Sequence, residues 1–208
     1  HGGGGPGSGA VGCKEMLKPF LPSPVVTKDE NGYHLCRCNP QSIGAVKEFY
    51  GNFLVVIRAL TYVLTLGKEG IPEASSNAVL NCNYMMSHLK DIYEMAFDTG
   101  CMHEFVMTLE NLKKEKDVSA MDVAKALLDN GIHAPTMYFP LIVHEALMVE
   151  PTETEPREVL DHAIEVFRNI YEMAQTEPEK LHEMPLHTPV RRLDEVGAAR
   201  NPHLRFEF

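Results

Sequence analysis

The strongest candidate for chemistry is the glycine-rich segment at residues 1–9, which reads His-Gly-Gly-Gly-Gly-Pro-Gly-Ser-Gly. Glycine adopts positive φ at little cost and lets backbone N–H groups approach an anion closely. The segment lacks the Gly-Lys-Ser/Thr ending of a phosphate-binding P-loop and the spacing of a dinucleotide-binding turn. It is therefore a candidate anion-binding loop. The alternative is a flexible linker or a cloning remnant, although the internal proline and the flanking histidine speak against an artificial spacer.

Two further segments have compositions that are unusual for a protein core. Residues 131–140 form an extended segment with two prolines, which places it at a sheet edge or across a cleft. Residues 148–155 contain three carboxylates, of which Glu153 and Glu155 are explained by a helix N-terminus, where negative charge is favourable. Glu150 directly follows a predicted strand and has no such explanation. Both segments are therefore candidates for a functional role.

The spacing of histidines and cysteines argues against a metal site. The ten histidines include no His-x-x-x-His or His-Glu-x-x-His pair. Cys36 and Cys38 are separated by one residue, where a zinc knuckle usually has two to four. The five cysteines are odd in number and irregularly spaced, unlike a disulfide framework. We therefore predict no metal and cysteines that remain reduced.

Charge and hydropathy exclude two classes of partner. The 208 residues include 19 Lys+Arg and 29 Asp+Glu, a net charge of −10, so the basic footprint of a nucleic-acid-binding protein is missing. The longest apolar run, residues 53–66, includes Arg58 and is shorter than the span of about 20 residues that a bilayer requires. No basic segment followed by an apolar one opens the chain, so no signal peptide is expected.

The first half of the chain is predicted to contain a hairpin and two helices. Asn31 and Gly32 lie between two apolar runs, which is a strong hairpin signal because both residue types tolerate positive φ. Residues 53–66 are apolar nearly all round, which predicts a buried helix that ends at Gly67. A second helix is expected from Pro72 to about Phe97, with Asn83 as a polar residue in its apolar stripe.

The second half alternates strand and helix. The predicted strands occupy residues 105–109, 137–139 and 146–149. Ser119 and Asp122 form a capping box at the start of a helix that ends at Gly131. Pro156 lies in the first turn of the next helix, where its missing N–H does no harm. This order predicts an α+β domain in which helices cover one face of a small sheet.

The pattern divides the chain into four predicted parts. These are a glycine- and proline-rich loop and linker (residues 1–24), a hairpin and connection (25–50), an α+β domain (51–177) and an extended tail (178–208). The tail is assigned because the chain becomes rich in proline and charge there and lacks periodicity.

Several motifs together resemble one enzyme family. They are residues 1–7, 80–85, 103–105, 133–140, 148–155 and 189–200, in a single order along the chain. In this combination the chain resembles the carboxy-terminal part of the glycine decarboxylase P-protein, also called glycine dehydrogenase (decarboxylating). Residues 189–196 favour subunit 2 of the bacterial two-subunit form. The departures are small: Ala10 replaces a usual proline, Ile132 a usual phenylalanine, and residues 38–40 read Cys-Asn-Pro where Asp-Arg-Pro is common.

The resemblance implies the small carboxy-terminal domain of a fold-type-I enzyme that depends on pyridoxal phosphate. It implies decarboxylation of glycine and transfer of the aminomethyl group to the lipoyl arm of the H-protein. The other P-protein subunit would be a partner, and the full enzyme a cytoplasmic oligomer. In the family the cofactor lysine lies in a His-Lys-Thr context just upstream of the glycine loop. None of the lysines here has that context, so the chain alone is expected to be inactive.

The resemblance also assigns site residues. A mobile loop beside the cofactor would comprise His1, Gly2, Gly3, Gly4, Gly5 and Gly7. Gly51 and Asn52 would offer polar groups to the cofactor phosphate of a neighbouring subunit, since a helix N-terminus suits an anion; a plain helix cap by Asn52 is the open alternative. His133 and Thr136 are candidates to face the substrate.

Two other functions remain open at this point. A non-catalytic assembly or scaffold domain could keep the fold of the family, and a related decarboxylase could act on another amino acid. An arginine placed for a side-chain carboxylate would favour the second, and residues 133–155 contain none. Glycine is therefore the predicted substrate.

Overall fold

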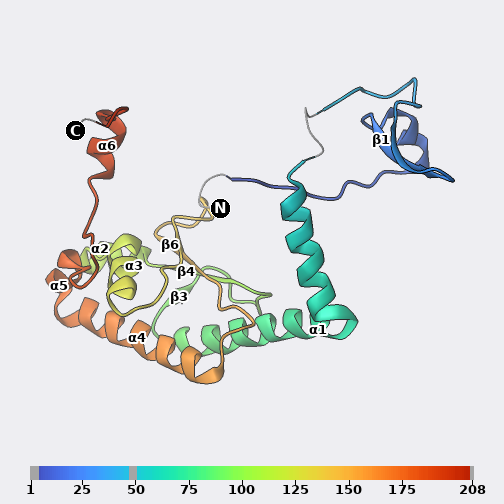
Figure 1. The fold of residues 1–208 in the computed structure, drawn as a ribbon. Coiled ribbons are helices and arrows are strands. Elements are labelled where there is room, and N and C mark those ends of the chain that lie inside the picture. Colours follow the sequence, from blue (N-terminus) through green and yellow to red (C-terminus); the bar gives the residue numbers. More distant parts are fainter. Residues whose placement is uncertain (1–4, 47–50, 207–208) are drawn as a thin grey trace. The chain divides into compact units, whose positions relative to one another are not determined.

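The computed structural model describes residues 5–46 and 51–206 and divides into two compact units (Figure 1). The first unit lies within residues 1–69 and the second within residues 70–208. The boundary falls inside one long kinked helix, α1 (Phe53–Leu89). The four-part division of the chain stays a prediction.

The first unit contains the predicted hairpin. Its first three elements are the 3₁₀ helix η1 (Glu15–Phe20) and the antiparallel strands β1 (Val25–Asp29) and β2 (Gly32–Cys36). The Asp29 carboxylate accepts a hydrogen bond from the Asn31 backbone N–H at 2.8 Å, and Gly32 adopts a φ of +113°. An Asp side chain bonded to its own turn and a glycine at positive φ stabilise such a connection. The hairpin prediction is confirmed.

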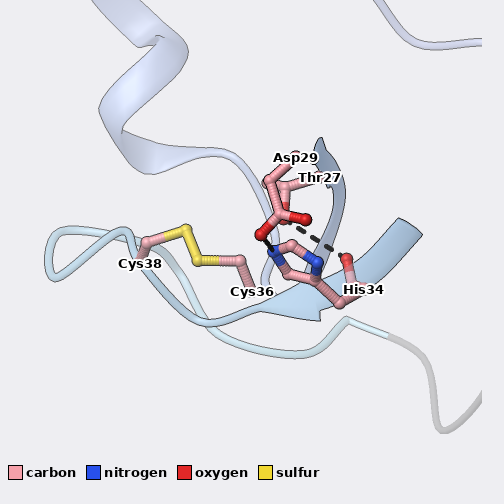
Figure 2. Close-up of a disulfide and its surroundings, with 5 residues drawn as sticks. All are labelled: Thr27, Asp29, His34, Cys36 and Cys38. Carbon is pink, nitrogen blue, oxygen red and sulfur yellow. Dashed lines mark hydrogen bonds and ion pairs between the residues drawn. A yellow bond between two sulfur atoms is a disulfide. The ribbon is translucent and has the colours of Figure 1, made fainter. Parts of the chain in front are cut away.

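A disulfide joins Cys36 and Cys38 directly after β2 (Figure 2). The prediction that the cysteines remain reduced is therefore wrong for this pair. With one residue between them, the two Cα atoms lie 5.3 Å apart, inside the range in which a disulfide forms. Figure 2 also shows that the His34 ring faces the Asp29 carboxylate, 3.6 Å away, and that the Thr27 hydroxyl donates to the His34 carbonyl at 3.3 Å.

The first half of α1 is exposed, which corrects the prediction of a buried helix. Residues 53–66 are helical as predicted, and the kink lies at Gly67, whose φ of +66° and ψ of −166° depart from helical geometry. None of the side chains of residues 53–66 is buried: Leu54 is 77% exposed and Ile57 is 39% exposed. An apolar pattern indicates a surface that needs a partner layer, but it does not say whether the same chain supplies that layer.

The second half of α1 ends earlier than predicted. Its buried side chains are Cys82, Met85, Met86 and Leu89. The helix ends at Leu89 rather than near Phe97, because the chain turns there and Tyr93 enters the core. The Tyr93 hydroxyl donates to the Phe167 carbonyl at 2.9 Å. The apolar spacing that continues through Tyr93 and Ala96 therefore belongs to the edge of the sheet.

The second unit is built on a four-stranded antiparallel sheet with the strand order β3-β4-β6-β5. The strands are β3 (Glu94–Met95), β4 (Phe105–Thr108), β5 (Thr136–Met137) and β6 (Ala146–Val149). In β4 the side chains of Phe105 and Met107 are buried, whereas Val106 and Thr108 are partly exposed. The predicted alternation is confirmed. β5 begins one residue earlier than predicted and has only two residues.

Helices complete the α+β fold that the sequence predicts. They are the second half of α1, α2 (Glu110–Lys116), α3 (Ala120–Asp129) and α4 (Arg157–Thr176). In Figure 1 the second half of α1 runs beside α4, and the Arg168 guanidinium ties α4 to Asp91 at 2.7 Å. The capping box is confirmed: the Ser119 hydroxyl accepts from the Asp122 N–H at 3.2 Å, and the Asp122 carboxylate accepts from the Ser119 N–H at 2.8 Å.

The tail is tied to α3 and is less extended than predicted. It contains two short helices, α5 (Pro178–Glu183) and α6 (Glu195–Arg200). Arg192 donates to the buried Asp122 carboxylate at 2.7 Å. Burial disfavours the charged form, but hydrogen bonds from Ser119 and Arg192 outweigh it and hold the pKa of Asp122 below its usual value. This carboxylate therefore contributes stability above about pH 4, which is lost as the pH falls through its lowered pKa.

Candidate functional site

The second unit contains an open cavity of about 570 Å³. The loop after α3, the end of β6 and the start of α4 all contribute to its walls. Its ionisable and hydroxyl groups include Glu104, His133, Thr136, Glu150, Glu155 and His162. Buried apolar side chains, among them Met85, Leu160 and Phe167, line the rest. A concave site with an apolar wall and a few convergent polar groups is the usual form of a small-molecule site.

Both predicted substrate-facing residues, His133 and Thr136, line this cavity. The loop that contains them is fixed at both ends. At its start Gly131 adopts a φ of +74°, and the Ile132 N–H donates back to the last turn of α3 at 3.0 Å. At its end Thr136 pairs with Met148 of β6 in the sheet. The structure thus holds His133 between two anchored points.

Asn81 positions the part of the cavity wall that contains Glu150 and Glu155. This role was not predicted from the sequence. The Asn81 Nδ2 donates to the Thr152 carbonyl at 2.8 Å and to the Glu155 carbonyl at 3.1 Å. These bonds fasten the segment after β6 to α1. Glu150 lies at the start of this segment and is exposed within the cavity lining. A polar amide next to buried positions of a helix was the signal that could have identified Asn81.

Asn83, the polar residue in the apolar stripe, has a similar role. Its Nδ2 donates to the Cys101 carbonyl at 2.7 Å, and its Oδ1 accepts from the Cys101 N–H at 3.2 Å. One amide therefore satisfies both backbone groups of Cys101 and fixes the segment that leads to Glu104 in the cavity wall. Asn83 is polar because its amide binds the backbone of this segment, and not because of how the helix packs.

The predicted cofactor-binding residues lie in the first unit, and four of them, His1, Gly2, Gly3 and Gly4, are outside the described residues. Of the others, Asn52 contacts Gly7. The Asn52 Nδ2 donates to the Gly7 carbonyl at 2.7 Å, which joins the glycine loop that contains Gly5 to the start of α1. Gly51 adopts a φ of +81°, and a Cβ added there would lie 3.2 Å from the Ser8 hydroxyl.

Charge in the cavity is predominantly negative. The described lining residues include Glu104, Glu150 and Glu155 but neither lysine nor arginine. Such a lining attracts an amino group more strongly than an anion. No group of three or more His, Cys, Asp or Glu side chains in residues 5–46 and 51–206 has a metal-binding arrangement. In the same ranges no helix has both the length and the apolar character that crossing a bilayer requires.

A solved structure shares the fold of this chain. The chain is similar to a crystal structure of glycine decarboxylase (P-protein) of the glycine cleavage system in inhibitor-bound form, with a TM-score of 0.59 and 19% identity. The similarity covers 75% of this chain and 37% of that chain. The chain therefore shares the α+β fold of part of that structure, and the predicted α+β class is confirmed.

Sequence comparison defines the family. The family described as "Glycine dehydrogenase, C-terminal domain" matches residues 74–188, and the chain belongs to this family. Among relatives named "Probable glycine dehydrogenase (decarboxylating) subunit 2", that of Treponema denticola is 58% identical over 207 residues and that of Fervidobacterium nodosum 50% over 207 residues. Each match covers 100% of this chain and 43% of the relative, so the chain spans less than half the length of these proteins.

Proposed function

We propose that this chain is the carboxy-terminal part of subunit 2 of a glycine dehydrogenase (decarboxylating), the P-protein of the glycine cleavage system. The observation that supports this best is the joint cavity of His133, Thr136 and Glu150, inside the region that matches the family. The complete enzyme would decarboxylate glycine and pass the aminomethyl group to the lipoyl group of the H-protein. Its other partner would be the second P-protein subunit, in an oligomer in the cytoplasm.

We assign glycine to the cavity in the second unit. Glu150 would attract the ammonium group, and the His133 ring and the Thr136 hydroxyl would donate hydrogen bonds to the carboxylate. The roles of these residues are binding and orientation of glycine.

Pyridoxal phosphate fits the contact between the glycine loop and the start of α1. Gly51 leaves room beside the Ser8 hydroxyl that a Cβ would restrict. The first N–H groups of a helix have no partner within the helix and suit an anion, so Ser8 and the backbone after Asn52 would hold the phosphate. Of the predicted loop residues, Gly5 and Gly7 would lie beside the cofactor ring; His1, Gly2, Gly3 and Gly4 are outside the described residues. When bound, the cofactor supplies an electron sink for the decarboxylation.

The lysine that holds the cofactor is proposed to lie outside this chain. The chain contains lysines but no His-Lys-Thr sequence. Alone it is then inactive, and a test requires the rest of the enzyme.

A chimaera tests the proposed function. This chain replaces the matching carboxy-terminal region of the Treponema denticola protein, which is produced together with the other subunit and the lipoylated H-protein. Glycine-dependent release of CO₂ is expected within about tenfold of the parent enzyme, since the two regions are 58% identical. If the chimaera folds and binds pyridoxal phosphate but releases no CO₂ while the parent does, the proposal is wrong. A non-catalytic scaffold domain would give a chimaera that folds and binds pyridoxal phosphate but releases no CO₂.

A further inference from the structure

Two thiols of the second unit lie in contact, and the cavity chemistry described above does not use them. The Sγ atoms of Cys82, on α1, and Cys101, between β3 and β4, are 3.0 Å apart. A disulfide bond is about 2.0 Å long, so closing one requires an approach of about 1 Å. Both cysteines are free in the structure.

The contact is built into the backbone and does not depend on the thiols themselves. Asn83, the residue next to Cys82 on α1, holds both the N–H and the carbonyl of Cys101 through its side-chain amide. A third bond, from Asn83 Nδ2 to the Val79 carbonyl at 2.8 Å, fixes the amide on the helix. The two sulfur atoms are therefore held at a high effective concentration.

The two thiols differ in access. Cys82 is completely buried, whereas Cys101 is partly exposed and lines a second cavity of about 360 Å³. Burial raises the pKa of Cys82 well above its usual range, and the Cys101 thiol and the carboxylates of Glu104 and Glu150 raise it further. A small oxidant therefore reaches Cys101 first, and Cys82 is protected from direct attack.

We propose that Cys82 and Cys101 are a peroxide-sensitive dithiol that closes to an intramolecular disulfide. The Cys101 thiol loses its proton and the thiolate attacks hydrogen peroxide; the O–O bond breaks, a sulfenic acid forms, and the released hydroxide takes up that proton to give water. The Cys82 sulfur then attacks the Cys101 sulfur, the S–O bond breaks, and the Cys82 proton passes to the leaving hydroxyl, which departs as a second water. Two thiols and one peroxide thus give one disulfide and two waters. This modification site is independent of the proposed function.

Peptide mapping of the 208-residue chain tests the proposal. The chain is treated with hydrogen peroxide, remaining thiols are alkylated, and the protein is digested with trypsin without reduction. Cleavage after Lys90 separates the two cysteines into peptides 69–90 and 91–113. We expect these peptides to be linked, with about tenfold more product than any link to the exposed Cys13, because only the prearranged pair has a high effective concentration. Dithiothreitol should separate them again.

Two variants give the control. Cys13→Ser should leave the link unchanged, whereas Cys82→Ser should leave Cys101 without a partner and allow its oxidation to the sulfinic acid. If Cys101 in the chain without substitutions is oxidised to sulfenic or sulfinic acid and no linked peptides form, the proposal is wrong. It is equally wrong if Cys13 forms links to Cys101 in comparable amounts. Peptide mapping of the chain without substitutions tests the proposal even if a variant does not fold.

Discussion

Replacing His133 by alanine in the complete enzyme is expected to lower glycine-dependent release of CO₂ by about a hundredfold, the scale of losing one positioned donor in an active site. His133 is exposed and lines the cavity, and within residues 5–46 and 51–206 no hydrogen bond or ion pair holds its ring. A structural role would leave it packed or bonded. The free energy of unfolding should therefore change by no more than about 0.5 kcal/mol.

The matched control is His144→Ala. His144 is also exposed and lies in the loop before β6, but it does not line the cavity. Its replacement should leave the rate of CO₂ release unchanged. Equal activity of the two variants would mean that the cavity does not receive glycine, and a large loss of stability in His133→Ala would mean that the residue is structural.

The chain studied without the rest of the enzyme is expected to self-associate through the first half of α1. Apolar side chains are exposed along this helix, and Leu54, Ile57 and Tyr62 line an open groove of about 640 Å³. Exposed apolar patches beyond a few hundred Å² rarely persist on monomers. Because the curated relatives are more than twice as long as this chain, we expect residues outside it to cover the groove in the complete enzyme.

Light scattering over a wide dilution series measures this association. The double variant Leu54→Gln, Ile57→Gln should weaken it by about a hundredfold, since each substitution removes an apolar contact worth about 1–1.5 kcal/mol. Glutamine favours helix, so the fold of α1 should persist. The control is Leu141→Gln, Ile142→Gln, at two exposed apolar residues of a loop, which should not change the association. A chain that stays monomeric at every concentration would contradict this account of the helix.

Elements defined by local interactions were predictable from sequence. The hairpin follows from the turn at Asn31 and Gly32, and the start of α3 from the capping box of Ser119 and Asp122. Alternating apolar residues located β4. In each case a few neighbouring residues determine the geometry through hydrogen bonds or side-chain periodicity.

Features that depend on distant residues were not predictable. The end of α1 at Leu89 follows from the burial of Tyr93 beside α4, and helical spacing continues past that point in the sequence. The apolar side chains of the helix before Gly67 are exposed, and their pattern does not say whether this chain supplies the residues that cover them. Similarly, Asn81 and Asn83 bind backbone groups about 70 and 18 residues away in sequence, respectively, so their polarity was visible but their targets were not.

The claim that the His133 cavity receives glycine can be tested most directly by chemical protection in the complete enzyme. Diethyl pyrocarbonate modifies exposed histidines, and mass spectrometry reports His133 and His144 separately. With pyridoxal phosphate bound, saturating glycine should slow the modification of His133 by about tenfold, because the bound ligand excludes the reagent. His144 should react at the same rate with and without glycine. Modification of His133 at an unchanged rate in an active, glycine-saturated enzyme would contradict the account.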